Sequence, residues 1–156
     1  MEKEINFYSR DEEYGWLSNF ARYPQTVDGK TYPTNEHYYQ SQKTLDKEAS
    51  ERIASAPSPF LAMRAGRSLG GEEFRSDWEK VKVEVMLKGL RAKFQQHPEL
   101  AQKLLATKDA VLHENSQTDM FWGKRGKDQL GKLLMQVREE LRLAQTAPTP
   151  YTSGNK

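Results

Sequence analysis

The segment that decides the fold is Glu73–Gln95, which reads EFRSDWEKVKVEVMLKGLRAKFQ. Its apolar residues recur at intervals of three and four, which puts them on the same side of an α-helix. They form two lines, one of Phe74, Trp78, Val81 and Val85 and the other of Val83, Leu87, Leu90 and Phe94. A helix with two apolar lines is typical of a buried element. We therefore predict that residues 73–95 form the central helix, buried on more than one side.

The most regular helical pattern lies near the C-terminus. Apolar residues there keep an i, i+3, i+4, i+7, i+11 stripe, formed by Leu130, Leu133, Leu134, Val137 and Leu141. Four shorter helices are predicted over residues 34–45, 47–55, 59–69 and 98–107, with proline or paired glycines at several of their boundaries. Thr34 is the predicted N-cap of the first of these helices. The body of the protein should therefore be helical.

Strands are predicted at the N-terminus and before the last helix. Residues 5–8 and 110–114 are rich in residues that favour strands. Residues 25–27 and 30–32 flank Asp28-Gly29, the pair that a type I′ hairpin turn prefers. Together with the helices, these segments predict an α+β fold that is mostly helical and carries a small antiparallel β-sheet.

The size of the chain fits a single domain. A chain of 156 residues with 36% hydrophobic composition can bury one sizeable core. We expect residues 1–144 to form this domain. Residues 145–156 contain proline, threonine, serine and glycine without an apolar period, so we expect them to be a disordered tail.

Composition narrows the possible functions. The chain has no cysteine, which removes disulfides and thiolate catalysis, and with three histidines a protein-ligated zinc site is not expected. A net charge of +2 does not by itself indicate a duplex nucleic-acid binder. No segment is apolar enough to span a bilayer and the N-terminus is too charged for a signal peptide, so a cytoplasmic location is expected.

The segment 34–43, TNEHYYQSQK, carries the first candidate site. At about 100° per residue, Glu36, Gln40 and Lys43 fall within one stripe of a helix, with Tyr39 beside them. Burying Glu and Lys is costly unless they pair or do chemistry, so the stripe either faces water as an ordinary ion pair or lines a polar cleft. The neighbouring rings, including Tyr38 and Tyr39, favour the cleft, because flat rings suit stacking on a base or sugar.

The segment 118–131 carries the second candidate site, with glycines and basic residues just before the last helix. Free N–H groups at a helix N-terminus favour an anion such as phosphate, and Lys124, Arg125 and Lys127 would add positive charge. The alternative is a solvated connector with Asp128 as an ordinary N-cap. Arg67 could contribute a further phosphate contact or could simply be exposed.

Several separated motifs in a fixed order give the chain a family resemblance over residues 5–142. They are INFY (5–8), LSNF (17–20), VDGK (27–30), YPT (32–34), EHY (36–38), QK (42–43), DW (77–78), Asp119, FWG (121–123) and LGKLLM (130–135). A set of ordered motifs is more specific than one short pattern. In these motifs the chain resembles the YbiA-like (NADAR) family of N-glycosidases. The resemblance implies hydrolysis of N-glycosidic bonds to ribose, without a cofactor.

The resemblance also implies roles for individual residues. The catalytic residues of the family fall on Glu36, Lys43, Trp78 and Asp119. Two carboxylates can protonate a leaving nitrogen and stabilise positive charge at the anomeric carbon, and a lysine amine can attack the ring-opened imine to form a Schiff base. The substrate-binding residues that we expect are Asn19, Tyr38, Tyr39, Gln40, Arg67, Trp122, Gly123, Lys124, Arg125 and Lys127.

The chain departs from the family pattern after Gly123. Related sequences usually continue with more glycines and a Gly-Lys-Asn, whereas this loop is shorter and has Asp128 in place of the amide. Three functions stay open. The first is an N-glycosidase acting on a ribosylamine 5′-phosphate, such as the ribosylamino-pyrimidine intermediates of riboflavin biosynthesis. The second is a hydrolase of ADP-ribosylated guanine in nucleic acid, and the third is a non-catalytic module that binds NAD or ADP-ribose.

Overall fold

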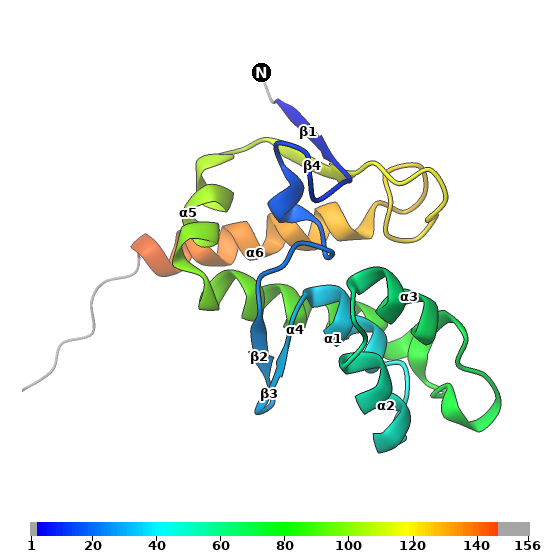
Figure 1. Cartoon of the computed structure of the whole chain (residues 1–156). Helices are drawn as coiled ribbons and strands as arrows, with labels where there is room; N and C mark the ends of the chain where they lie inside the picture. The colour runs from blue at the N-terminus through cyan, green and yellow to red at the C-terminus, as the bar shows by residue number, and fades with distance from the viewer. Residues whose placement is uncertain (1–2, 147–156) are drawn as a thin grey trace, which may run out of the picture.

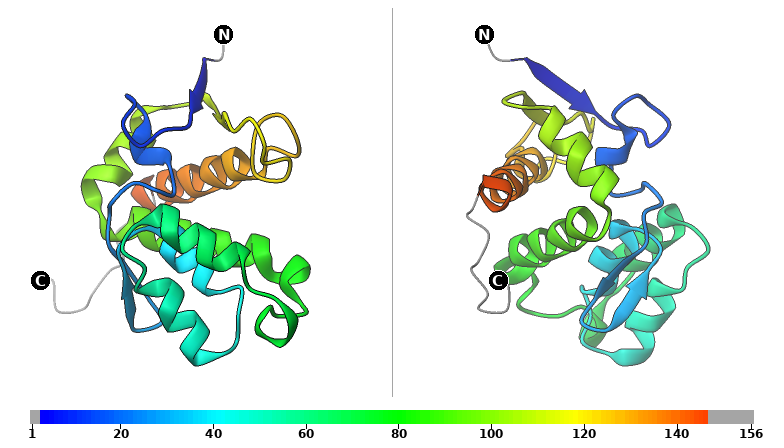
Figure 2. Two further views of the ribbon diagram at one scale, coloured as in Figure 1. Left: turned by 45° about the vertical axis from the view of Figure 1, so that its right-hand side comes forward. Right: turned by 90° about the vertical axis from the view of Figure 1, so that its left-hand side faces the viewer.

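The computed structural model describes residues 3–146 and has a helical body with two small sheets (Figure 1). The elements in chain order are β1 (Glu4–Phe7), η1 (Gly15–Leu17), β2 (Gln25–Val27), β3 (Lys30–Tyr32), α1 (Asn35–Ser41), α2 (Lys47–Ala54), α3 (Pro59–Arg67), η2 (Gly71–Glu73), α4 (Trp78–Gln96), α5 (Pro98–Ala106), β4 (Val111–Glu114) and α6 (Gln129–Thr146). In both views of Figure 2, α6 lies between the β1–β4 pair and α4. The predicted α+β class, mostly helical with a small antiparallel sheet, is confirmed.

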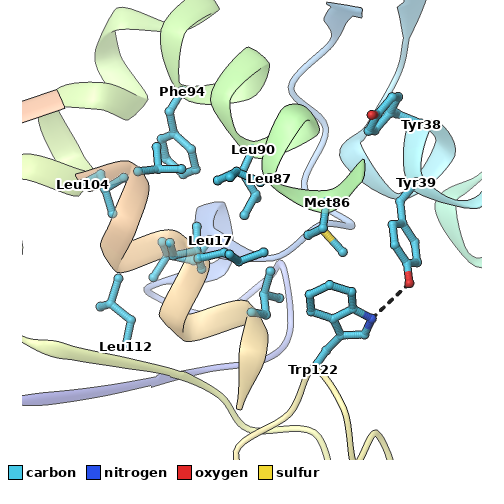
Figure 3. Close-up of a cluster of buried hydrophobic side chains, with 14 of the residues drawn as sticks. Leu17, Tyr38, Tyr39, Met86, Leu87, Leu90, Phe94, Leu104, Leu112 and Trp122 are labelled. Carbon is cyan, nitrogen blue, oxygen red and sulfur yellow. Dashed lines mark hydrogen bonds between the residues drawn. The ribbon is translucent and has the colours of Figure 1, made fainter. Parts of the chain in front are cut away.

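Helices α4 and α6 form the centre of the hydrophobic core (Figure 3). Leu90 and Phe94 of α4 and Leu130 and Leu134 of α6 are each 0% exposed, as their spacing predicts. The central helix nevertheless begins at Trp78 and not at residue 73. Phe74 lies ahead of it and is 39% exposed, so its place on the apolar line was wrong. The reason is that the carboxylate of Asp77 pairs with Arg75, which holds this segment outside the helix.

The two sheets differ in strand direction. Strands β2 and β3 form the predicted antiparallel hairpin, and both turn residues have positive φ, 51° at Asp28 and 82° at Gly29, as a type I′ turn requires. Strands β1 and β4 pair in parallel, with Glu4 opposite Val111. This differs from the antiparallel set that we expected. The helical body between the two strands is long enough to return the chain to the same end of the sheet, which a parallel pair needs.

Helix α1 is short, polar and buried along its whole length. Thr34 caps it as predicted, since the Thr34 hydroxyl accepts a hydrogen bond from the His37 amide at 3.1 Å. Two glycines allow the neighbouring helices to approach closely. A Cβ at Gly66 of α3 would lie 2.1 Å from the side-chain oxygen of Gln40, and one at Gly89 of α4 would lie 2.2 Å from that of Asn35. Helix α1 is therefore held between α3 and α4.

The predicted extension of this first helix to Leu45 is wrong, because it ends at Ser41. Distant residues donate hydrogen bonds to the last carbonyl of the helix and to the two carbonyls that follow it. The Ser50 hydroxyl donates to the Ser41 carbonyl, and the Arg75 guanidinium donates to the Gln42 carbonyl at 3.3 Å. The Arg75 amide donates to the Lys43 carbonyl at 2.9 Å. With these groups satisfied by distant residues, the chain can leave the helix without exposing unpaired carbonyls.

The C-terminal helix is longer than predicted. Helix α6 continues to Thr146 and so includes residues 145 and 146 of the expected tail. Residues 147–156 of that tail lie outside the described residues. Between residues 3 and 146, no helix is long and apolar enough to cross a membrane.

A buried lysine ties α4 to the N-terminal segment. Lys93 is 0% exposed, and its Nζ donates to the carbonyls of Trp16 at 2.7 Å and of Ser18 at 3.0 Å. Burial lowers the pKa of Lys93 to about 7. A neutral amine has two N–H donors, which matches the two carbonyls that it contacts. Lys93 thereby holds the turn that leads to Asn19.

Replacing Lys93 by Met should lower the free energy of unfolding by about 1–3 kcal/mol, because two buried carbonyls lose a donor. The loss should grow with pH above about 7, where native Lys93 has released its proton while the unfolded lysine keeps it until about 10.5. Urea unfolding of both proteins between pH 7 and 9 measures this difference. A difference that is the same at every pH would contradict the assignment of a neutral amine.

Candidate functional site

A cavity of about 420 Å³ opens between α1, α3, α4 and the segment that joins β4 to α6. Its walls come from all parts of the chain. They are formed by Tyr8, Asn19, Phe20, Glu36, Tyr39, Gln40, Lys43, Met63, Arg67, Lys82, Met86, Glu114, Ser116, Thr118, Asp119, Phe121, Trp122 and Leu130. Eight of the residues predicted as site residues are among them: Asn19, Glu36, Tyr39, Gln40, Lys43, Arg67, Asp119 and Trp122.

Glu36 forms the buried acid of the cavity and is 7% exposed. Burial raises the pKa of the Glu36 carboxyl above its ordinary value, while the hydrogen bond from Gln40 and the charge of Lys43 oppose this shift. Gln40 Nε2 donates to Glu36 Oε2 at 2.8 Å. The Glu36 amide donates to the Asn19 carbonyl at 3.0 Å, which fixes the start of α1 against the Asn19 segment. The solvated-face alternative is therefore wrong for Glu36 and Gln40.

Lys43 follows α1 in a turn and directs its amine to the same cavity. Within residues 3–146 the amine makes no hydrogen bond or ion pair, and its Nζ lies 5.6 Å from the centre of the Tyr39 ring. Burial lowers the pKa of Lys43, the negative charge of Glu36 opposes this shift, and the positive charge of Arg67 adds to it. An unpaired amine with a lowered pKa is chemically available for nucleophilic attack.

Asp119 is positioned by the backbone of its own loop. Its Oδ1 accepts hydrogen bonds from the amides of Phe121 at 3.0 Å and Trp122 at 2.8 Å. The Asp119 amide in turn donates to the Ser116 hydroxyl at 3.0 Å. The second oxygen, Oδ2, has no hydrogen-bond partner in the described part of the chain and remains available to a ligand.

Aromatic rings contribute to one wall of the cavity. Trp122 Nε1 donates to the Tyr39 hydroxyl at 3.0 Å, and the two rings meet edge to face (Figure 3). Trp78 is 4% exposed and stands outside the cavity lining. Its ring centre lies 5.2 Å from that of Tyr39, so it packs against a residue of the lining.

Tyr38 also lies away from the cavity. It is 2% exposed, and its hydroxyl donates to the Val85 carbonyl at 3.0 Å. Tyr38 precedes Tyr39 by one position in α1, and adjacent residues of a helix point in different directions. Only Tyr39 of this pair faces the cavity.

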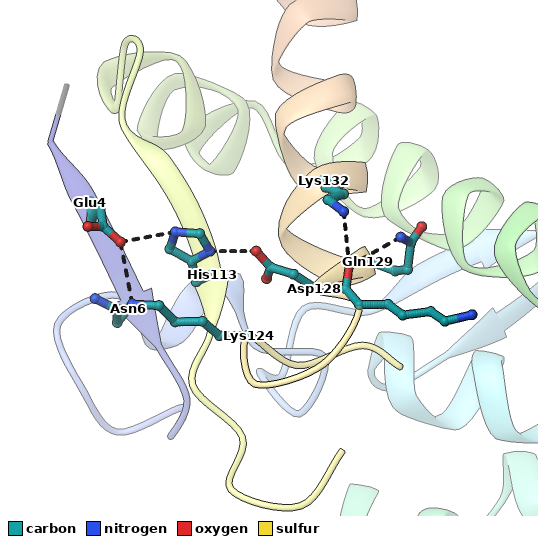
Figure 4. A network of polar contacts seen from close by, with 8 residues as sticks. Glu4, Asn6, His113, Lys124, Asp128, Gln129 and Lys132 are labelled. Atoms are coloured by element: carbon teal, nitrogen blue, oxygen red, sulfur yellow. Dashed lines mark hydrogen bonds and ion pairs between the residues drawn. The ribbon is translucent and has the colours of Figure 1, made fainter. Parts of the chain in front are cut away.

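The basic loop before α6 does not contribute its cations to the cavity either. Gly123, Lys124, Arg125 and Lys127 are all outside the lining. Figure 4 shows the Lys124 amine between Asn6, at 2.7 Å, and Glu4, at 3.4 Å. Arg125 is exposed, and Lys127 Nζ lies 5.7 Å from the centre of the Phe121 ring. These side chains bind to the first strand or face solvent. They therefore do not gather into the phosphate site that we predicted for this loop.

Asp128 joins the same network and is not an ordinary N-cap. Its Oδ2 pairs with His113 Nδ1 at 2.6 Å, and His113 Nε2 lies 3.1 Å from Glu4 (Figure 4). The φ of Asp128 is 56°, a left-handed conformation that Asn and Asp adopt more easily than most residues. The carboxylate that replaces the amide of the family is thus held by a histidine of β4.

Two charged residues of the lining were not predicted from the sequence. Glu114 ends β4, and burial together with the charges of Asp119 and Glu36 raises its pKa to about 7. Lys82 of α4 lies with its Nζ 3.7 Å from the centre of the Phe121 ring and pairs with Glu79 at 2.7 Å. Neither residue belongs to a recognisable motif. The one sequence signal for Glu114 was its place as a charged residue at the end of a short strand.

The cavity has no arrangement typical of a metal site. In the described ranges, no group of three or more His, Cys, Asp or Glu residues could hold a metal ion. The cavity offers three carboxyl groups, one unpaired amine and aromatic side chains. Such a set suits proton transfer and attack at a sugar carbon.

Comparisons with known proteins identify the family. Residues 6–142 match the NADAR domain. The chain is 51% identical over 141 residues to N-glycosidase YbiA of Escherichia coli, covering 88% of each chain. The NMR structure of E. coli YbiA matches with a TM-score of 0.86 and 47% identity, covering 97% of this chain and 92% of that one. The chain belongs to the NADAR family.

Two further relatives bear on activity. A protein of Nostoc punctiforme named as an N-glycosidase is 40% identical and covers 88% of this chain and 92% of its own. A protein of Vibrio vulnificus named as a riboflavin biosynthesis protein is 43% identical, over 90% of this chain but 39% of its own length. These names support an N-glycosidase hydrolase activity for the chain.

The position of Asp119 should depend on the two amide hydrogen bonds that Oδ1 accepts. Replacing Asp119 by Ala should lower the free energy of unfolding by about 2 kcal/mol, because both amides lose their acceptor. Replacing it by Asn retains one oxygen and should cost less than half as much. Urea unfolding measures both changes. Equal losses for the two variants would show that these hydrogen bonds do not stabilise the loop.

Proposed function

We propose that the protein hydrolyses the C–N bond between ribose 5-phosphate and an amine of a base, such as a ribosylamino-pyrimidine. The observation that carries this proposal is that Glu36, Lys43 and Asp119 line one cavity, although they come from different parts of the chain. Each also interacts electrostatically with the other two. The name of the Vibrio relative supports the choice of a riboflavin intermediate as substrate.

Lys43 acts as the nucleophile in this proposal. A ribosylamine opens its ring to an imine, and the neutral Lys43 amine adds to carbon 1 of the sugar. The C–N bond to the base then breaks, the departing nitrogen takes a proton from Glu36, and carbon 1 stays bound to Lys43 as a Schiff base. Water adds to carbon 1 and releases ribose 5-phosphate and free Lys43. Every proton that Glu36 gives is returned when water adds.

Asp119 orients the sugar or the attacking water through Oδ2, since Oδ1 is occupied by backbone amides. Asn19, Tyr39, Gln40 and Trp122 line the cavity beside the three reacting groups and contact the substrate. Trp78 and Tyr38 act from behind the lining as positioning residues. Trp78 does so through the ring of Tyr39.

The phosphate binds near Arg67 in this proposal. Arg67 and Lys82 bring positive charge to the cavity besides Lys43, whereas Lys124, Arg125 and Lys127 do not line it. The guanidinium of Arg67 makes no hydrogen bond or ion pair within residues 3–146. A planar guanidinium free of partners can bind phosphate with two parallel hydrogen bonds.

Direct assays separate this function from the alternatives. The purified protein is incubated with a ribosylamino-pyrimidine phosphate and, separately, with an ADP-ribosylated oligonucleotide, while release of the free base or sugar is followed. Release from the first substrate supports the proposal. Release only from the oligonucleotide favours the ADP-ribosyl-guanine hydrolase. Release from neither substrate, together with binding of ADP-ribose, favours the non-catalytic module.

Replacing Lys43 by Arg should lower turnover on the order of 10³-fold, because a guanidinium stays protonated and cannot form an imine. Borohydride added during turnover should give the wild-type protein the mass of a reduced ribose-phosphate adduct, measured by mass spectrometry. The Lys43→Arg variant should show no adduct. Lys82→Arg, in the same cavity, should still form the adduct on Lys43. Full turnover by Lys43→Arg would exclude the covalent route.

The pH profile of kcat/KM should be bell-shaped. The lowered pKa of Lys43 makes the neutral amine available at a lower pH than for an ordinary lysine, and the raised pKa of Glu36 keeps that acid protonated to a higher pH than for an ordinary glutamate. In Glu36→Gln the falling limb should disappear. The rising limb should move to lower pH, because the negative charge that opposes the shift of Lys43 is gone. Unchanged limbs in this variant would contradict both assignments.

A further inference from the structure

A second cavity of about 370 Å³ adjoins the first. The two share three residues, Tyr8, Phe20 and Glu114, so they are adjacent compartments of one site. The first compartment holds the charged groups Glu36, Lys43 and Asp119. The second is lined by three aromatic residues, Tyr8, Phe20 and Phe60, and also by Arg10 and Asp11.

Two of these rings are unusually exposed. Tyr8, directly after β1, is 56% exposed, and Phe60, in the first turn of α3, is 51% exposed. Exposed aromatic rings that gather at a depression mark a binding surface more often than they do when scattered. Planar rings offer their faces to stacking with a flat ligand, and every heterocyclic base has such a face.

Glu114 supplies a polar group at the boundary of the two compartments. Its carboxylate makes no hydrogen bond or ion pair with any described residue, and it contributes to the lining of both cavities. A carboxyl group in this place can bond to an N–H of a ligand that extends from one compartment into the other. The serine hydroxyls of the second lining, of Ser9, Ser18 and Ser58, already accept hydrogen bonds from backbone amides, and Arg10 donates to the Phe20 carbonyl.

We infer that the second cavity binds the leaving base: a planar heterocycle with an exocyclic amine stacks on Tyr8 and Phe60, and Glu114 bonds to its nitrogen at the junction. This inference rests on the proposed function, in which the sugar and phosphate occupy the first cavity. The scissile C–N bond then lies at the junction, where both cavities are lined by Tyr8, Phe20 and Glu114. A base of the size of a pyrimidine fits a compartment of this volume.

Equilibrium binding of the two products tests whether the base binds in the second cavity and the sugar phosphate in the first. The probes are a free aminopyrimidine and ribose 5-phosphate, and binding is measured by calorimetry with the full chain. Tyr8→Ala and Phe60→Ala should each weaken aminopyrimidine binding about tenfold, because a stacking face is lost. Binding of ribose 5-phosphate should not change in Phe60→Ala, because Phe60 does not line the first cavity. Both side chains are more than half exposed, so the variants should fold, which thermal unfolding checks.

Two further variants complete the design. Phe74→Ala removes an exposed ring that lines neither cavity and should change neither binding constant. Glu114→Gln retains the size of the side chain and should weaken the aminopyrimidine alone. Aminopyrimidine binding that is absent in the wild type, or equal in the wild type, Tyr8→Ala and Phe60→Ala, would overturn the inference.

Failure of this inference can be told apart from failure of the proposed function. If the wild type releases base and the variants bind aminopyrimidine unaltered, the N-glycosidase function is supported and the base-binding subsite is contradicted. Weakened aminopyrimidine binding in the variants, without any release of base by the wild type, would support a base-binding compartment and contradict the proposed reaction.

Discussion

The burial of helix α1 is the constraint on which the rest of the structure depends. Buried polar side chains are costly unless each finds a partner, and α1 carries several within two turns. Asn35 donates to Asn19 and accepts from Gln25, and His37 contacts the Ala56 carbonyl at 2.9 Å. These partners come from the segments before and after the helix. The surrounding fold must therefore close around α1 from several sides, and the cavity lies where this closure is incomplete.

The same constraint determines the electrostatics of the cavity. Glu36 is buried because α1 is buried, so its charged form is disfavoured and Lys43 beside it also tends towards neutrality. Three carboxyl groups, of Glu36, Glu114 and Asp119, face the cations of Lys43, Arg67 and Lys82 across one volume. Because the Glu36 carboxyl and the Lys43 amine interact, the protonation state of each depends on the other. Such a pair suits chemistry that moves a proton.

Regular patterns in the sequence predicted the parts of the fold that follow local rules. Asp28-Gly29 specifies its turn through the φ values that it tolerates, and the stripe of α6 specifies which side is buried. The end of α1 could not be predicted, because Arg75, far along the chain, donates to the carbonyls of Gln42 and Lys43 directly after the helix. The loop cations were misplaced for the same reason: Lys124 binds Asn6 and Glu4 of a strand at the other end of the sequence. The ordered motifs, by contrast, identified Glu36, Lys43 and Asp119 from the sequence, and these three residues line one cavity.

Because β1 pairs in parallel with β4, the cavity can form only late in folding. Among the described residues, β4 is the one strand that pairs with β1, and it follows β1 by most of the chain. Strand β1 therefore cannot pair until β4 has been synthesised. Closing so long a loop costs entropy and makes the contact a late event in folding. Tyr8, Glu114 and Asp119 reach the cavity only with this closure. A nascent chain still on the ribosome therefore carries Glu36 and Lys43 without their opposite wall, and the complete pocket forms only after synthesis has reached the last helix.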